Sequence, residues 1–125
     1  MVKILLDTNF LLYCIEQKIR FIEQIDEKMH SQYELIILDK VMNELKIISQ
    51  RSNQKEKLAA KIALGLINSI SSFKIVNGKG KNADDSLLLF DFKDIIIASV
   101  DKELRKRFKN ACFLTIKHKK YLDFI

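Results

Sequence analysis

The stretch Val2-Lys3-Ile4-Leu5-Leu6-Asp7-Thr8-Asn9-Phe10 decides how the rest of the chain is organised. Its first five residues are mostly aliphatic and include no turn former, which predicts a short buried strand. Three polar residues then interrupt the apolar pattern, so a carboxylate is expected where the strand ends. Asp7 keeps two interpretations at this point, functional carboxylate or helix cap, because Asp and Thr oxygens also accept bonds from the free amides of a first helical turn.

Length and composition indicate one globular domain over residues 1–125, large enough to bury a core without disulfides or metals. The 22 Lys and Arg residues exceed the 16 Asp and Glu residues, which gives a net charge of +6 and favours a polyanionic partner such as nucleic acid. Cys14 and Cys112 lie in separate apolar runs, so both are expected to be buried, reduced thiols. Neither a signal peptide nor an apolar stretch of ~20 residues is found, which predicts a cytoplasmic protein without membrane association.

Apolar runs alternate with helical patterns along the chain. The runs are continuous, as expected for strands that are buried on both faces. They predict strands at 2–6, 34–38, 73–76, 95–100 and 112–116. Between the strands, helices are expected at 10–15, 19–29, 39–48 with Asp39 as cap, 58–70, 87–90 and 102–109. The alternation predicts an α/β fold with three layers, α/β/α, around a central parallel sheet of four or five strands.

Four carboxylates follow four different predicted strands: Asp7, Glu44, Asp84 and Asp101. The carboxyl ends of parallel strands share one edge of a sheet, so these side chains are expected to meet there. Unit charges about 4 Å apart repel by about 4 kcal/mol near a protein surface, and a cation would relieve that repulsion. Ligands that are all oxygen suit Mg²⁺ or Mn²⁺. In a basic protein, such a site predicts metal-assisted attack of water on a phosphodiester.

Four segments resemble the motifs of the PIN-domain nucleases, in the family's order and over nearly the whole chain. They are Asp7-Thr8-Asn9, Val41-Met42-Asn43-Glu44-Leu45, Ala83-Asp84-Asp85 and Ser99-Val100-Asp101-Lys102-Glu103-Leu104-Arg105. The resemblance implies a ribonuclease that depends on Mg²⁺ or Mn²⁺. It also implies roles for single residues. Asp7, Glu44, Asp84 and Asp101 would be the catalytic metal ligands, Asn9 and Ser99 would orient them, and Asp85 would cap a helix or support the ligand set.

Within that family, segments 78–85 and 117–122 look more like the archaeal stand-alone branch related to ribosomal-RNA-processing nucleases than like toxins. The expected partner is therefore RNA, including precursor ribosomal RNA. The fourth motif has Ser99-Val100 where many toxins carry Thr-Asn, and no zinc ribbon is appended. A toxin ribonuclease with an antitoxin partner and a non-catalytic RNA-binding assembly module remain alternatives. Apolar faces on the first helices would also allow a homodimer.

Basic residues gather in two parts of the sequence. Lys79 and Lys81 precede Asp84, and eight Lys and Arg residues lie between Lys102 and Lys120. They are candidates for contacts with the RNA backbone, first among them Lys79, Lys81, Lys102 and Arg105. The alternative is a solvated, lysine-rich face. His30 and His118 are each isolated in the sequence, so both are expected to be ordinary surface residues.

Overall fold

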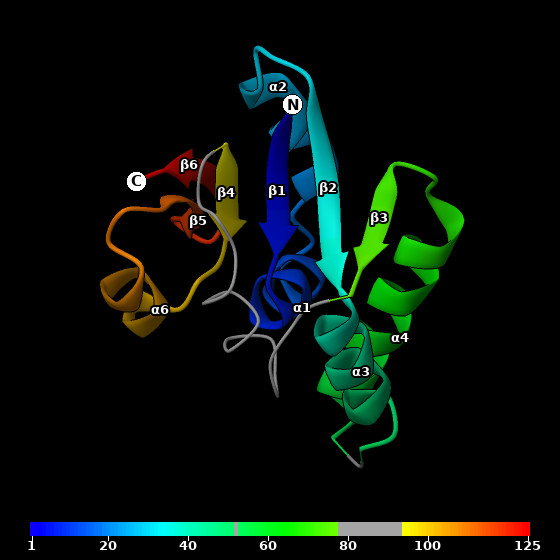
Figure 1. Ribbon diagram of the computed structural model, residues 1–125. Coiled ribbons are helices and arrows are strands. Elements are labelled where there is room, and N and C mark those ends of the chain that lie inside the picture. The colour runs from blue at the N-terminus through cyan, green and yellow to red at the C-terminus, as the bar shows by residue number, and fades with distance from the viewer. Residues whose placement is uncertain (52, 78–93) are drawn as a thin grey trace.

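A computed structural model describes residues 1–51, 53–77 and 94–125. In these ranges six strands form one sheet in the order β3-β2-β1-β4-β5-β6 (Figure 1). The first five strands in the chain are parallel, whereas β6 runs antiparallel to β5. The expected α/β fold with a mostly parallel sheet is confirmed, and β6 is an addition that was not predicted. The strands are β1 (Val2–Leu6), β2 (Tyr33–Leu38), β3 (Phe73–Val76), β4 (Ile95–Ala98), β5 (Cys112–Lys117) and β6 (Tyr121–Phe124).

The central strands are buried along most of their length. Every residue of β4 is buried, as are the last three residues of β1 and the last four of β2. Such strands lose apolar surface on both faces, which explains why their sequences are continuous apolar runs. β4 ends at Ala98, two residues earlier than expected, so Ser99 and Val100 connect the strand to Asp101.

Five helices lie in the described ranges: α1 (Thr8–Glu16), α2 (Phe21–Lys28), α3 (Asp39–Ile48), α4 (Gln54–Ser69) and α6 (Lys102–Arg107). Helices α1, α3 and α4 contact one another, and α2 contacts β6. Figure 1 shows α1 and α2 behind the sheet, α3 and α4 alongside β2 and β3, and α6 near β4 and β5. The helix expected at 87–90 lies outside the described residues.

The structure refines one expectation about the helices and corrects another. Leu58 and Ile62 are 60% and 47% exposed, whereas α4 buries Ala59, Ala60 and Ala63. The short alanine side chains bring the axis of α4 close to its neighbours, and the bulkier aliphatic row therefore faces away. Asp39 is the first helical residue of α3 and not its cap, and Leu38 occupies the cap position.

The two cysteines lie in different surroundings. Cys14 is fully buried, and burial raises the pKa of its thiol to about 12. Cys112 is exposed, which corrects the expectation that both thiols are buried. It lies at the start of β5, before that strand enters the core. His30 and His118 are both exposed, as expected. Of the helices in the described ranges, none combines the length and the apolar character needed to cross a membrane.

Candidate active site

The sheet reverses its strand order at β1. The chain adds β2 and then β3 on one side of β1, and afterwards places β4 on the other side. In an open parallel sheet, ligands bind beyond the carboxyl ends of the strands at such a reversal. The backbone ladder continues past both strands there, because the Asp7 amide donates to the Ala98 carbonyl at 3.1 Å and the Ser99 amide to the Leu114 carbonyl at 3.0 Å. These bonds place Asp7 beside Ser99.

Asp7 and Ser99 are joined through their side chains. The Ser99 hydroxyl donates to Oδ2 of Asp7 at 3.0 Å, although the residues are 92 positions apart in the sequence. Ser99 is fully buried, so its hydroxyl is held in place by the surrounding core. Asp7 occupies the N-cap position of α1 but makes no capping hydrogen bond through its side chain. The cap interpretation of Asp7 is therefore wrong, and its carboxylate is oriented by a neighbouring strand instead.

Asp101 is linked to the same serine. Its backbone amide donates to the Ser99 hydroxyl oxygen at 3.1 Å. Its side chain caps α6, since Oδ1 accepts from the amides of Glu103 and Leu104 at 2.9 and 3.3 Å. Both capping bonds use Oδ1, and neither uses Oδ2. Ser99 thus connects two of the predicted acids, and the cap holds the second acid at a fixed orientation.

The third predicted acid is Glu44, on the helix that follows β2. It is half-buried on α3, which begins directly after β2. Its carboxylate forms no hydrogen bond or ion pair with any residue in the described ranges. Asn9 lies in the first turn of α1 and is exposed. Both side chains are therefore available to a ligand at the carboxyl ends of the strands.

Two buried polar atoms at this edge lack a hydrogen-bond partner among the described residues, Thr8 Oγ1 and Arg105 Nε. Thr8 follows Asp7 directly and is 2% exposed, and Arg105 lies one turn after Asp101 in α6. Buried polar groups are nearly always satisfied, so an unsatisfied pair at one edge indicates a partner from outside these residues. The sequence indicates Thr8 only as a cap, since nothing local distinguishes a buried threonine hydroxyl from a capping one.

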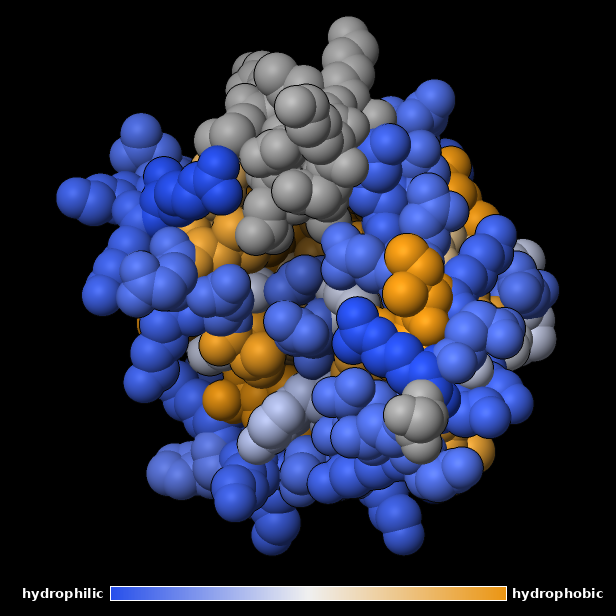
Figure 2. Space-filling view, turned by 90° about the horizontal axis from the view of Figure 1, so that it is seen from below, coloured by the Kyte–Doolittle hydropathy of each residue, from blue (hydrophilic) through white to orange (hydrophobic). Residues whose placement is uncertain are grey.

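The rest of the predicted site is described only in part. Asp84, Asp85, Lys79 and Lys81 lie in 78–93, outside the described residues. In the ranges that are described, no three His, Cys, Asp or Glu side chains come close enough together to hold a metal ion. Lys102 is exposed at the start of α6, and Arg105 is half-buried. Figure 2 looks onto the carboxyl ends of the strands and shows a mostly hydrophilic face broken by apolar patches.

The basic residues between Lys102 and Lys120 do not form one patch. Lys106 and Arg107 line a hollow with Asp101 at α6, whereas Lys117, Lys119 and Lys120 line hollows against α2. The two groups line different hollows that have no residue in common. Only the α6 group adjoins one of the predicted acids.

Comparison with known proteins agrees with this architecture. The model of the PIN-like domain family matches residues 4–119. The chain is 33% identical to Ribonuclease VapC4 of Methanocaldococcus jannaschii, in an alignment that covers 98% of this chain and 96% of that protein. The chain therefore belongs to the PIN-like domain family.

Solved structures share the fold. The PIN domain endonuclease Utp24 superposes with a TM-score of 0.73 at 24% identity, covering 97% of this chain and 90% of that chain. VapBC2 from Rickettsia felis, bound to a DNA fragment from its promoter, gives a TM-score of 0.59 at 15% identity and covers 98% of this chain and 100% of that chain. At these identities the two likenesses concern the fold alone.

Proposed function

We propose that the protein is a ribonuclease that hydrolyses RNA phosphodiester bonds with the help of Mg²⁺ or Mn²⁺. The observation that carries the proposal is the Ser99 hydroxyl, which donates to Asp7 and accepts from the Asp101 amide at the carboxyl ends of β1 and β4. A buried serine that orients one acid and anchors the backbone of another supports a preorganised acidic site. The membership in the PIN-like family and the name of the relative Ribonuclease VapC4 support RNA as the substrate.

The donor set fits a hard divalent cation. Asp7, Glu44 and Asp101 supply carboxylate oxygens from β1, α3 and the start of α6, and we assign Asp84 as the fourth ligand. The buried hydroxyl oxygen of Thr8, which has no partner among the described residues, adds a further oxygen beside Asp7. When bound, the cation would lower the pKa of a water molecule and balance the negative charge on the phosphate.

The side chains of this chain have separate roles in the proposal. Ser99 keeps Oδ2 of Asp7 in a fixed position. The cap bonds to Oδ1 of Asp101 hold that carboxylate so that Oδ2 is the oxygen offered to the cation. Asn9, exposed in the first turn of α1, would contact the scissile phosphate or an acid, and Asp85 would support Asp84.

The natural substrate has two candidates. Sequence resemblance in segments 78–85 and 117–122 favours processing of precursor ribosomal RNA. The relative at 33% identity is instead named Ribonuclease VapC4. VapBC2, whose name has the same Vap stem, is a solved structure with the same fold. That name supports the toxin alternative, in which an antitoxin protein would be the partner.

Cleavage of a structured RNA tests the proposal. The wild type is expected to cleave in Mg²⁺ or Mn²⁺ and to be inactive in a chelator, and Asp7→Asn is expected to lose at least about 100-fold in rate because it removes a metal ligand. Asp26→Asn, which neutralises an exposed carboxylate on α2 and keeps the oxygen that accepts from Tyr33, is the matched control and should cleave normally. Cleavage that persists in the chelator, or an Asp7→Asn rate equal to that of the control, would refute the proposal.

A further inference from the structure

The turn between β5 and β6 is unusual in its backbone. His118 and Lys119 both have left-handed φ angles, 54° and 57°, and the Lys120 amide donates to the Lys117 carbonyl at 3.1 Å. A tight turn of this kind usually contains Asn and Gly, because left-handed φ costs other residues roughly 1–2 kcal/mol each. The chain instead places His and Lys at the two strained positions, so the turn presents cationic side chains at a cost in stability.

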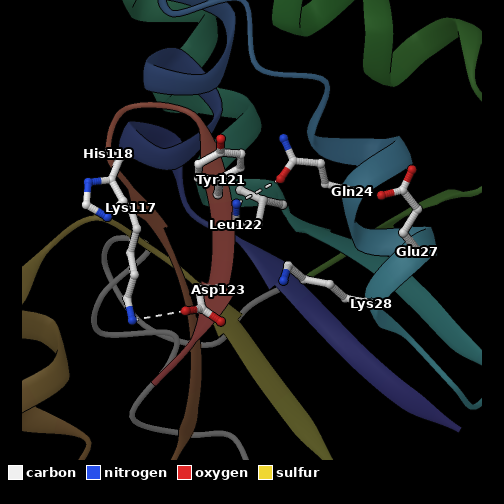
Figure 3. Close-up of a pocket in the computed structure, with 8 residues that line it drawn as sticks. All are labelled: Gln24, Glu27, Lys28, Lys117, His118, Tyr121, Leu122 and Asp123. Carbon is white, nitrogen blue, oxygen red and sulfur yellow. Dashed lines mark hydrogen bonds and ion pairs between the residues drawn. The ribbon is translucent and has the colours of Figure 1, made fainter.

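A glutamine holds this turn against α2. The Gln24 side chain donates to the Lys120 carbonyl at 3.0 Å and accepts from the Leu122 amide at 2.8 Å. Figure 3 shows Gln24 reaching from α2 to the backbone of the hairpin, with the side chains of both elements around the hollow. The two bonds fix the position of the turn relative to α2 and to the linker that precedes it.

Two hollows meet at this junction, of about 590 and 520 Å³, and Gln24 and Glu27 line both. We name their combined lining the hairpin surface. It carries six cationic side chains against three carboxylates, an excess of three, which is half of the net charge of +6. The cations are Lys18, Arg20, Lys28, Lys117, Lys119 and Lys120, and the carboxylates are Glu23, Glu27 and Asp123.

Pairing within the hairpin surface leaves several cations available. Arg20 lies 3.6 Å from Glu23, and Lys117 lies 3.0 Å from Asp123. The hydrogen bond from Lys117 holds the pKa of Asp123 below its usual value. Lys18, Lys119 and Lys120 form no ion pair with any side chain in the described ranges. They come from two segments about one hundred residues apart, which Gln24 brings together.

The character of the surface favours RNA over an acidic protein. Tyr121 is 55% exposed beside the cations, whereas the other apolar lining residues, Ile19 and Leu122, are buried. A protein interface needs an apolar centre, which the hairpin surface lacks. Cations that follow a backbone and an aromatic ring that stacks on a base are the features of single-stranded nucleic acid binding.

We propose that the hairpin surface is a second RNA-binding site, at which Lys18, Lys119 and Lys120 contact phosphates of single-stranded RNA and Tyr121 stacks on a base. The site rests on the proposed function, since it takes the same RNA. It lies at the far end of α1 from Asp7, and nine helical residues span about 13 Å. That separation along α1 is comparable to the length of about four stacked nucleotides at ~3.4 Å each, which is the scale of a short single strand.

Binding of a 5′-labelled 12-nucleotide oligouridylate, measured by fluorescence polarisation in a chelator over a salt series, tests the proposal without cleavage. The variant Lys119→Gln/Lys120→Gln is expected to make the slope of log affinity against log salt shallower by about 1.4, which is about 25-fold in affinity at ~0.1 M salt. Tyr121→Ala should weaken binding at least about fivefold and leave the slope unchanged.

The matched control is Lys55→Gln/Lys61→Gln, which removes the same charge from exposed positions of α4. Equal weakening by both double variants would overturn the site, because total charge would then account for the effect. A Lys119→Gln/Lys120→Gln variant that binds RNA normally but loses binding to polyglutamate would overturn it in favour of an acidic protein. Thermal unfolding verifies that each variant folds. Normal binding without metal-dependent cleavage would refute only the proposed function, and cleavage without any effect at the hairpin surface would refute only the second site.

Discussion

Ser99 is the residue on which the acidic edge depends. Its hydroxyl takes part in two hydrogen bonds at full burial, so Ser99→Ala is expected to lower the free energy of unfolding by about 1–3 kcal/mol. Because Asp7 would lose its orienting donor, the Mg²⁺ concentration needed for half-maximal cleavage should also rise. Ser49→Ala is the matched control, since Ser49 is buried and its hydroxyl donates to the Lys46 carbonyl and not to an acid. A normal metal requirement in Ser99→Ala would exclude the orienting role.

The two thiols should differ in reactivity. Burial raises the pKa of Cys14 to about 12, so its thiol stays protonated in the native state, and the thiolate is the reactive species. Titration with a thiol reagent at pH 8 is expected to count one reactive cysteine in the native protein and two in denaturant. The native count should remain one up to about pH 10 and fall to zero in Cys112→Ser. A second rapidly reacting thiol in the native protein would contradict the buried position of Cys14.

Asp101 combines two roles at the start of α6, and substitutions can separate them. Asn keeps a side-chain oxygen for the amides of Glu103 and Leu104, whereas Ala removes it. Asp101→Asn is therefore expected to be nearly as stable as the wild type, and Asp101→Ala to lose about 1 kcal/mol. Both variants should lose cleavage, because both lose the carboxylate. Urea unfolding and an RNA cleavage assay measure the two effects, and an active Asp101→Asn would leave Asp101 with the capping role alone.

The elements differ in how well their sequences predict them. Largely apolar runs identified all five parallel strands, because the central strands β1, β2 and β4 bury most of their residues and polar exceptions such as Lys3 lie near the start of a strand. β6 was missed because only Leu122 is fully buried in it and lysines directly precede it. In α4 the sequence offers two apolar rows, and close packing against α1 and α3 buries the row with Ala59 and Ala63. Which of the two apolar rows faces the core depends on the elements that pack against α4. The helical period alone therefore does not predict which row is buried.

The candidate site was predictable where topology determines it. Parallel strands bring their carboxyl ends to one edge, and the reversal at β1 then places Asp7 next to Ser99. The capping bonds of Asp101 and the unsatisfied hydroxyl of Thr8 depend on local geometry that residue spacing does not encode. The hairpin surface depends on a contact between residues 24 and 120, which no periodicity in the sequence indicates.

At the scale of the whole molecule, a bound cation should stabilise the fold. An ion that binds only the folded chain, at ~100 times its dissociation constant, adds about 2.7 kcal/mol, and for a chain of this length that raises the unfolding midpoint by on the order of 10 °C. The rise is expected with Mn²⁺ or Mg²⁺ in the wild type and in Asp26→Asn. It should be absent in Asp7→Asn, whose midpoint without metal serves as its own baseline. An equal rise in Asp7→Asn would show that the ion binds elsewhere on the protein. The acids would then have no part in binding it.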